Sequence, residues 1–228
     1  MEEVTEKRNM PFSIKDCTLI PRMVGVGTAM NLRELQERVR EAPVESLFHH
    51  FCETVIRPTF DDPEFRNDFA VWAARSIRDR VLAERLGILN PYVMNDFEEL
   101  RWHTLDILEE RLTEVPFIPW APRGDEFRFM QAVTVIFDTG KILESPVDLI
   151  RELPHLSLGS IYYHFVEARR RTTERQDDFT AWLTDFGDET HELISALKNI
   201  DFYFLALSEL KKVLVNVTRR VSLEAVHG

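Results

Sequence analysis

The most informative pattern in the sequence is an aromatic block, Ser160-Ile161-Tyr162-Tyr163-His164-Phe165-Val166-Glu167, which is followed by Asp177-Asp178-Phe179-Thr180-Ala181-Trp182. A related pair of blocks occurs earlier, Ser46-Leu47-Phe48-His49-His50-Phe51-Cys52-Glu53 and Asn67-Asp68-Phe69-Ala70-Val71-Trp72. The first blocks of the two pairs lie 114 residues apart and the second blocks 110 residues apart. Because the small difference falls in a polar connector, the sequence predicts an internal duplication.

Composition and charge exclude several classes of protein. The chain has 228 residues, of which 44% are hydrophobic, and its net charge is −11. Nucleic acids and anionic membranes attract basic surfaces, so neither is an expected partner. The first residues lack the apolar region of a signal peptide, and no apolar run is long enough to span a membrane. With two cysteines that form no metal or redox motif, Cys17 and Cys52, we expect a cytoplasmic protein.

Proline and glycine mark the expected domain boundaries. Three prolines and Gly124 fall in residues 116–124, which we predict to be a linker. Residues 1–10 are predicted to be flexible, with a first repeat at 11–115 and a second at 125–224. The expected fold class is α+β, mainly α, with two tandem similar halves. Each half would be a short strand or hairpin plus about four helices, and the halves would be related by a pseudo-two-fold axis, since fused homologues tend to reuse a dimer contact.

Local patterns predict individual elements. Alternation near Phe12 predicts a strand that Pro21 ends. Gly25–Gly27 is typical of a turn or a second short strand, and Asp138–Gly140 of a turn. Helical spacing predicts one long helix from Phe65 to Leu86. Asn31 and Ser145 are expected to cap the helices that follow them.

Most of the residues shared by the two halves have a structural explanation. Asp68 and Asp178 are suited to capping the helices that carry Trp72 and Trp182. A histidine among aromatic residues is most often a core side chain bonded to a carboxylate or carbonyl. Ser46 and Ser160 suit a first helical turn. Glu53 with Arg57, and Glu167 with Arg171, have the spacing of surface ion pairs on a helix.

A metal site is the alternative explanation of the same residues. Histidine and carboxylate three positions apart lie on one helix face, and two such pairs with two aspartates have the composition of a dinuclear site in a helix bundle. The divalent-metal ligands would be His50, Glu53, Asp68, His164, Glu167 and Asp178. The order His-x-x-Glu is the reverse of the ferritin-type motif, and neighbouring arginines would compete for the glutamates.

A third hypothesis is a ligand cleft lined by aromatic rings. Rings with a few hydrogen-bonding groups are suitable for a sugar or another small polar ligand. The candidate lining residues are His49, His50, Trp72, Tyr162, Tyr163, His164 and Trp182. The sequence contains no glycine-rich phosphate loop and no nucleophile elbow.

The block Ser160–His164, the segment Asp178–Trp182 and a leucine-rich final helix around Leu210 together resemble a bacterial and archaeal domain family of unknown function. The first-half copy departs from that pattern, with Phe48-His49 in place of the two tyrosines. The resemblance implies no activity. We therefore expect a non-catalytic binding, regulatory or scaffold protein whose partner is a protein or a small polar ligand. The alternative is a metal-dependent enzyme.

Overall fold

The computed structural model describes residues 10–53, 64–172 and 174–227, so residues 1–9 of the expected flexible N-terminus lie outside the described part. The chain divides into two compact units. Unit 1 comprises residues 1–18 and 135–228, and unit 2 comprises residues 19–134. The expected α+β class, mainly helical, is confirmed. No helix in the described ranges has the length and apolar character needed to cross a membrane.

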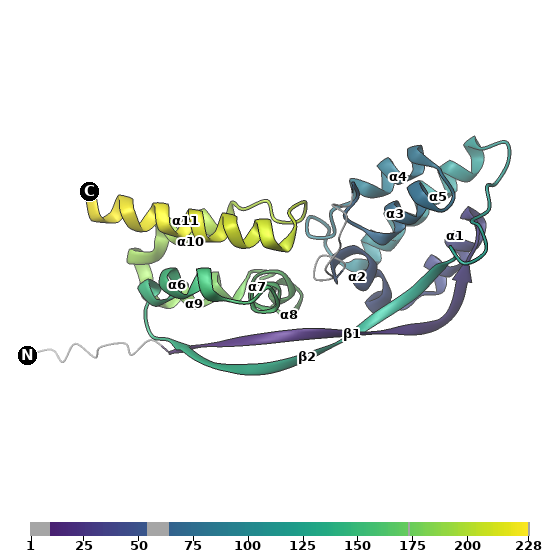
Figure 1. Ribbon diagram of the computed structural model, residues 1–228. Helices are drawn as coiled ribbons and strands as arrows, with labels where there is room; N and C mark the ends of the chain where they lie inside the picture. The colour runs from purple at the N-terminus through teal and green to yellow at the C-terminus, as the bar shows by residue number, and fades with distance from the viewer. Residues whose placement is uncertain (1–9, 54–63, 173, 228) are drawn as a thin grey trace, which may run out of the picture. The chain divides into compact units, whose positions relative to one another are not determined.

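Two long strands, β1 (Phe12–Ala29) and β2 (Phe127–Leu143), form a two-stranded sheet (Figure 1). The Thr139 hydroxyl donates to the carbonyl of Ile14, and Lys15 pairs with Asp138, so partner numbers fall along β2 as they rise along β1. The strands are therefore antiparallel. The boundary between the two units falls inside both strands, after Thr18 and after Thr134.

The predictions of a strand end at Pro21 and of a turn at Asp138–Gly140 were wrong. Pro21 lies inside β1, because each strand of a two-stranded sheet is an edge, and an edge strand tolerates a residue without an N–H donor. Of the two alternatives for Gly25–Gly27, the structure has strand, because the segment lies within β1, and Asp138–Gly140 lies within β2. Gly27 and Gly140 have φ values of 85° and 73°, so they bend the strands locally without reversing the chain.

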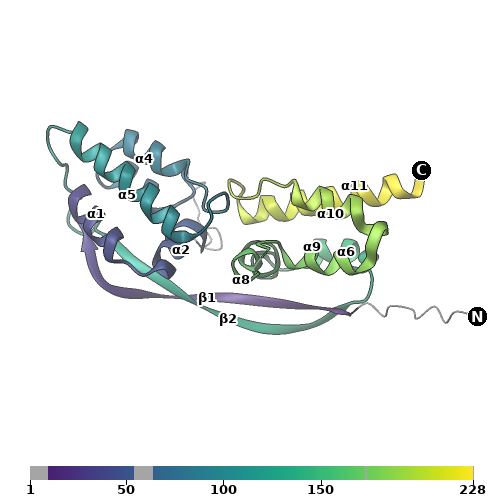
Figure 2. The same ribbon diagram turned by 180° about the vertical axis from the view of Figure 1, so that it is seen from behind.

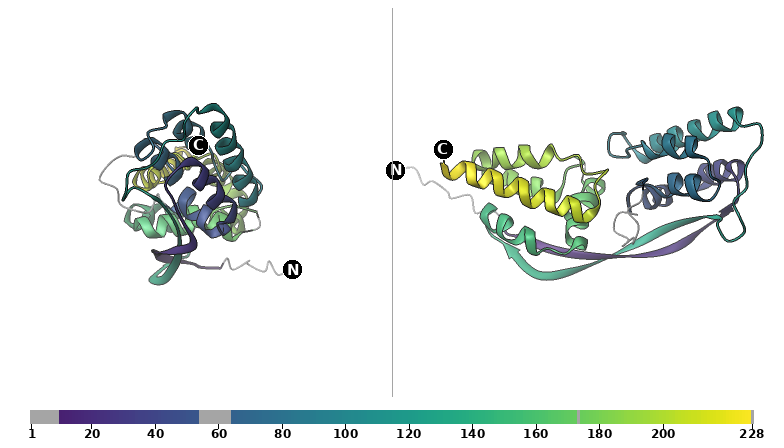
Figure 3. Two further views of the ribbon diagram at one scale, coloured as in Figure 1. Left: turned by 90° about the vertical axis from the view of Figure 1, so that its right-hand side faces the viewer. Right: turned by 45° about the horizontal axis from the view of Figure 1, so that its top comes forward.

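Five α-helices of unit 2 follow β1 in the described ranges. The Asn31 side chain caps the first of them, as expected, and that helix buries Leu32, Leu35 and Val39 at helical spacing. Helix α4 packs against both α3 and α5, and Figure 3 gives two further views of the helices of this unit. The helices are α1 (Leu32–Glu41), α2 (Val44–Cys52), α3 (Asp68–Arg75), α4 (Arg80–Gly87) and α5 (Phe97–Glu114).

The helices of unit 1 follow β2. Ser145 caps the first of them through a capping box with Asp148, as expected. Helices α10 and α11 pack against each other, which Figure 2 shows from behind. The helices are α6 (Pro146–Glu152), η2 (Leu153–His155), α7 (Leu158–Ile161), the π-helical η3 (Tyr162–Glu167), α8 (Ala168–Arg171), α9 (Asp178–Leu183), η4 (Thr184–Thr190), α10 (His191–Lys198) and α11 (Leu207–His227).

The single long helix predicted for Phe65–Leu86 is wrong, because the chain forms α3 and α4 instead. Arg78 adopts a left-handed conformation with φ of 56°, which ends the first helix. The Asp79 side chain then accepts a hydrogen bond from the backbone of Leu82 and caps the second helix. The apolar spacing continues across this break, which is why periodicity alone did not reveal it.

The chain has two helical series, α1–α5 and α6–α11. Each series belongs to the same unit as a strand segment that precedes the other series in the sequence. Residues 12–18 of β1 come before α1 but belong to unit 1, together with α6–α11. Residues 127–134 of β2 come before α6 but belong to unit 2, together with α1–α5. The compact units therefore do not coincide with the ranges 11–115 and 125–224.

Candidate functional site

His50 joins two helices and a strand in unit 2. It lies on α2 with only 2% of its surface exposed. Its Nδ1 lies 2.7 Å from Oδ2 of Asp68 at the start of α3, and its Nε2 lies 2.9 Å from the backbone nitrogen of Met130 on β2. Because a backbone amide can only donate, Nε2 accepts and Nδ1 carries the ring proton. His50 is therefore a neutral imidazole with both nitrogens engaged.

His164 makes the corresponding contacts in unit 1. Its Nδ1 lies 2.8 Å from Oδ2 of Asp178 at the start of α9, and its Nε2 accepts from the backbone N–H of Lys15 on β1 at 2.8 Å. It is also 2% exposed. The residue sits in the π-helical turn η3, a form that occurs mostly as short insertions within α-helices. The same argument assigns the proton to Nδ1.

The two tryptophans each form one further hydrogen bond, to a residue that lies two positions before the same strand. The indole N–H of Trp72 donates to the carbonyl of Asp125, and that of Trp182 donates to the carbonyl of Met10, both at 2.8 Å. Both side chains are mostly buried, at 6% and 7% exposed. In each unit the tryptophan and the histidine therefore bind the backbone at two points, just before the strand and near its start.

Rings pack between these two points in both units. Phe127 lies with its centroid 4.8 Å from that of His50, 4.7 Å from Phe69 and 5.9 Å from Trp72. Phe12 packs in the same way in unit 1, at 5.0 Å from the ring of His164, 5.7 Å from Phe179 and 5.4 Å from Trp182. These contacts make the repeated aromatic residues part of each unit's core.

The helix caps are not the aspartates that the sequence suggested. Asn67 caps α3 and Asp177 caps α9, each accepting from a backbone N–H three residues later. Asp68 and Asp178 are the first residues of the helices and point their carboxylates at the histidines. Asp177 is fully buried, and burial raises its pKa against the hydrogen bonds from Thr180 and the charge of Arg169.

The two glutamates have different partners in the two units. Glu53 lies 2.6 Å from Nδ1 of His49, and both side chains are buried. Glu167 binds Arg170 and Arg171, so its spacing to Arg171 does give an ion pair, but the carboxylate is buried and not on the surface. Arg57, the partner expected for Glu53, lies outside the described residues.

The tyrosines of the expected ligand cleft lie differently from each other. Tyr162 is fully buried. Tyr163 is partly buried beneath Arg171, whose guanidinium carbon is 4.1 Å from the ring centroid, and burial raises the pKa of its phenol. Arg171 also donates to Asp178 at 2.9 Å. Arg171 therefore covers the ring of Tyr163 and binds Asp178, the partner of His164.

The six proposed metal ligands fall into two sets. His50, Glu53 and Asp68 belong to unit 2, and the other three to unit 1. Within residues 10–53, 64–172 and 174–227, no group of three or more His, Cys, Asp or Glu side chains is placed to bind a metal ion. In the unit 2 set, Glu53 binds His49 and not the His50–Asp68 pair.

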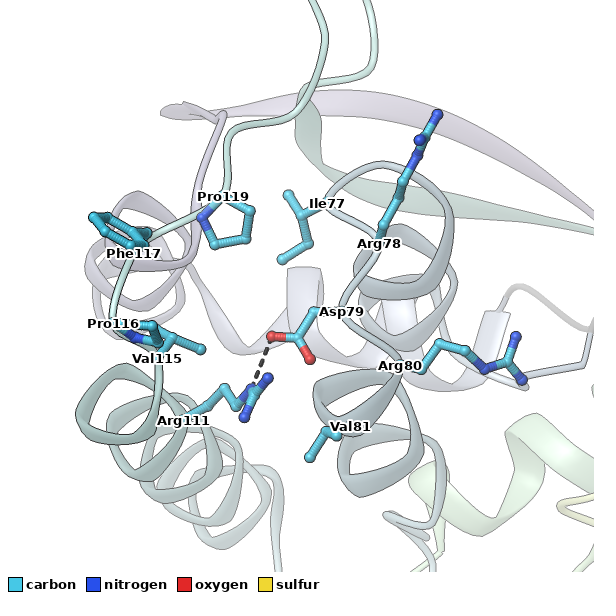
Figure 4. Close-up of a pocket in the computed structure, with 10 residues that line it drawn as sticks. All are labelled: Ile77, Arg78, Asp79, Arg80, Val81, Arg111, Val115, Pro116, Phe117 and Pro119. Carbon is cyan, nitrogen blue, oxygen red and sulfur yellow. Dashed lines mark hydrogen bonds and ion pairs between the residues drawn. The ribbon is translucent and has the colours of Figure 1, made fainter.

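A surface hollow of about 430 Å³ in unit 2 was not predicted from the sequence. Asp79 and Arg111 form an ion pair of 2.8 Å within it, and this hydrogen bond raises the pKa of Arg111 (Figure 4). Its walls include Ile77 and the proline-rich segment 115–119, whose Phe117 is 85% exposed. The prolines were interpreted as a linker, and nothing in their spacing indicated a pocket.

The sequence did contain a signal for the strand contacts. Phe12-x-Ile14 and Phe127-x-Phe129 lie 115 residues apart, close to the 114-residue offset of the aromatic blocks. Aligning the strands on the 115-residue offset pairs Met10 with Asp125, which are the residues whose carbonyls accept from the tryptophans. The helical blocks alone did not indicate that the tryptophans bind Met10 and Asp125.

Comparisons with known proteins give a family and a structural relative. A model of a family of unknown function, DUF5752, matches residues 9–219. Among solved structures, the chain is similar to OrfY from Thermoproteus tenax, with 27% sequence identity and a TM-score of 0.75. That similarity covers 93% of this chain and 96% of OrfY. Among curated proteins, none matches.

Proposed function

Because the chain belongs to the DUF5752 family of unknown function, family membership brings no activity with it, and we propose that the protein is a non-catalytic binding protein with a regulatory or scaffold role. The observation that carries this proposal is the use of the imidazole nitrogens. In both units Nδ1 of the motif histidine donates to an aspartate, and Nε2 accepts from a backbone N–H of a strand.

These contacts favour a structural role for the two histidines over a catalytic or metal-binding one. A histidine that acts as a general base or a metal ligand needs a ring nitrogen whose lone pair can reach a substrate or a metal. Here the lone pair of Nε2 points at an amide of the protein, and each imidazole is 2% exposed. The His–Asp pairs therefore fix helices to strands, which favours a binding protein over the metal-dependent enzyme.

The hollow in unit 2 supports a small polar ligand as the partner. Its volume of about 430 Å³ lies within the usual range of small-molecule sites. It combines apolar walls with the Asp79–Arg111 ion pair, which offers both hydrogen-bond donors and acceptors. A ligand-observed NMR screen against the wild-type chain and a Phe117→Ala variant tests this form of the proposal.

We further propose that the two helical series derive from an internal duplication. The parallel contacts of His50 and His164, and of Trp72 and Trp182, support a common origin. We also place the protein in the cytoplasm, because both of its cysteines are buried thiols, which suits a reducing compartment.

Elemental analysis of protein purified without chelators or metal-affinity resin tests the non-catalytic proposal against the metal enzyme. We expect wild-type protein to contain no stoichiometric iron, manganese or zinc. A His50→Ala/His164→Ala variant and a control His103→Ala/His155→Ala variant, which changes two exposed residues, should give the same metal content as wild type. Near-stoichiometric metal in the wild type and in the control, lost from the His50→Ala/His164→Ala variant, would overturn the proposal.

A further inference from the structure

Each unit binds an extended six-residue segment at its two ends. In unit 1 the indole of Trp182 donates to the carbonyl of Met10, the first residue of the segment, and Nε2 of His164 accepts from the N–H of Lys15, the sixth. In unit 2 Trp72 and His50 bind Asp125 and Met130 in the same order. We call each Trp–His pair, with the phenylalanine between them (Phe179 or Phe69), a strand clamp.

The clamps accept large apolar side chains at the third and fifth positions of the segment. The third residue is phenylalanine in both cases, and it packs against the His, Phe and Trp rings of the clamp. The fifth residue is Ile14 in unit 1 and Phe129 in unit 2, and both are fully buried. The segments in both clamps therefore share an aromatic residue at the third position and a large apolar residue at the fifth, with no shared residue type at the fourth.

The other positions of the segment differ in size and charge between the two units. Met10 corresponds to Asp125, and Ser13 corresponds to Arg128. Where the clamp forms hydrogen bonds, it contacts backbone N–H and C=O groups, which every such segment presents. The clamp consequently selects an extended segment by its backbone and by two side chains.

The segment in the unit 1 clamp is less buried than the one in the unit 2 clamp. Phe12 is partly exposed, whereas Phe127 is 4% exposed. In unit 2 the hydroxyl of Ser46 also donates to the carbonyl of Met130. The aligned Ser160 in unit 1 instead accepts from Ser157 within its own turn.

From these contacts we infer that the unit 1 clamp is an exchangeable docking site, and that its partner is the Met10–Lys15 segment of a second copy of this chain. This inference rests on the proposed binding role. The two segments that the structure shows in a clamp both come from this chain, so a second copy presents a segment that already fits. Reciprocal exchange between two copies would give a closed symmetric dimer.

Exchange competes with the chain's own segment. A segment tethered to its site has an effective concentration on the order of millimolar, so the intramolecular arrangement wins in dilute solution. A second copy therefore enters the clamp when protein is concentrated or when the chain's own segment is weakened. A Phe12→Ala substitution in the full chain weakens the binding of the chain's own segment to the unit 1 clamp. It leaves the residues of the clamp unchanged.

The test uses the full-length Phe12→Ala chain and a labelled peptide of residues 10–18. We expect saturable binding by fluorescence anisotropy and a rise in the melting temperature of the variant. The matched control is the same peptide with Phe12→Ala and Ile14→Ala, which should bind at least about tenfold more weakly because it lacks both buried side chains. Equal binding of both peptides, or no binding to a folded variant, would overturn the inference.

A second measurement covers the case in which the variant does not fold. Wild-type chains carrying two different affinity tags are mixed at about millimolar concentration, diluted and purified through both tags in sequence. Recovery of doubly tagged pairs supports exchange, and their absence overturns it. Failure of this test with metal-free protein would leave the non-catalytic proposal standing, so the two failures are distinguishable.

Discussion

The backbone N–H of Lys15 donates to Nε2 of His164 across 2.8 Å, although the two residues are 149 positions apart in the chain. The bond connects the start of β1 to a helix of the second series, and it uses the lone pair that a catalytic histidine would need. His50 and Met130 form the same relationship in unit 2 at 2.9 Å.

Removing either histidine should destabilise the fold. His164→Ala leaves a backbone amide and Asp178 without this partner and creates a cavity, so we expect a loss of about 2–4 kcal/mol in the free energy of unfolding. His50→Ala should behave similarly. Urea denaturation measures the change, and His103→Ala, at an exposed position, should stay within about 0.5 kcal/mol of wild type. A His164→Ala protein as stable as that control would contradict the structural role.

Removing a tryptophan hydrogen bond should destabilise the fold less than removing a histidine does. Trp182→Phe keeps an aromatic ring but removes the N–H that donates to Met10, and we expect a cost of about 0.5–1.5 kcal/mol. Trp72→Phe should cost a similar amount through Asp125. The matched control is Trp102→Phe, because Trp102 is 65% exposed. If all three variants melt at the same temperature as wild type, the indole bonds contribute nothing.

Gly159 should not tolerate even a methyl group. A Cβ at this position would lie 2.6 Å from the carbonyl oxygen of Cys17 and would also overlap Oδ1 of Asp16. Glycine to alanine in a helix normally stabilises by up to about 1 kcal/mol, but here overpacking should destabilise by about 1–3 kcal/mol. Gly25→Ala is the control, since no atom lies within 4 Å of its added Cβ. Chemical denaturation measures the free energy of unfolding of both variants. A Gly159→Ala protein more stable than wild type would show that β1 does not approach α7 this closely.

Stability should also depend on pH through Asp177. Burial raises the pKa of this carboxyl in the folded chain, so the folded state retains the proton to higher pH than the unfolded state does. The protonated Asp177 carboxyl therefore stabilises the fold below the ordinary Asp pKa of about 4. This stabilisation is lost as the pH rises through the pKa that Asp177 has in the folded chain. Asp177→Asn removes this titration and keeps the cap, as Asn67 does in α3.

The measurement for Asp177 is the difference in unfolding free energy between wild type and Asp177→Asn over a pH series. We expect the wild-type advantage to shrink as the pH rises from about 4. An advantage that grows over the same range would mean that the ion pair with Arg169 outweighs burial and lowers the pKa.

The sequence predicted local features better than it predicted which segments pack together. The caps at Asn31 and Ser145 follow from short-range chemistry and are confirmed. The break at Arg78 was missed because apolar spacing continues through it. The packing of residues 12–18 with the second helical series could not be predicted, since the same alternation of apolar residues fits either series. Asp68 and Asp178 were misassigned as caps because the residue before each is an equally good cap.

The central claim is that His50 and His164 are neutral, with the proton on Nδ1 and the lone pair of Nε2 accepting from a strand. Long-range ¹H–¹⁵N NMR spectra of the imidazoles near neutral pH, assigned with the single His→Ala variants, measure this directly. We predict that both rings are the Nδ1-protonated tautomer, with Nε2 unprotonated. Rings protonated on Nε2, or shifted by addition of a divalent metal, would contradict the account and favour a chemical role for the two histidines.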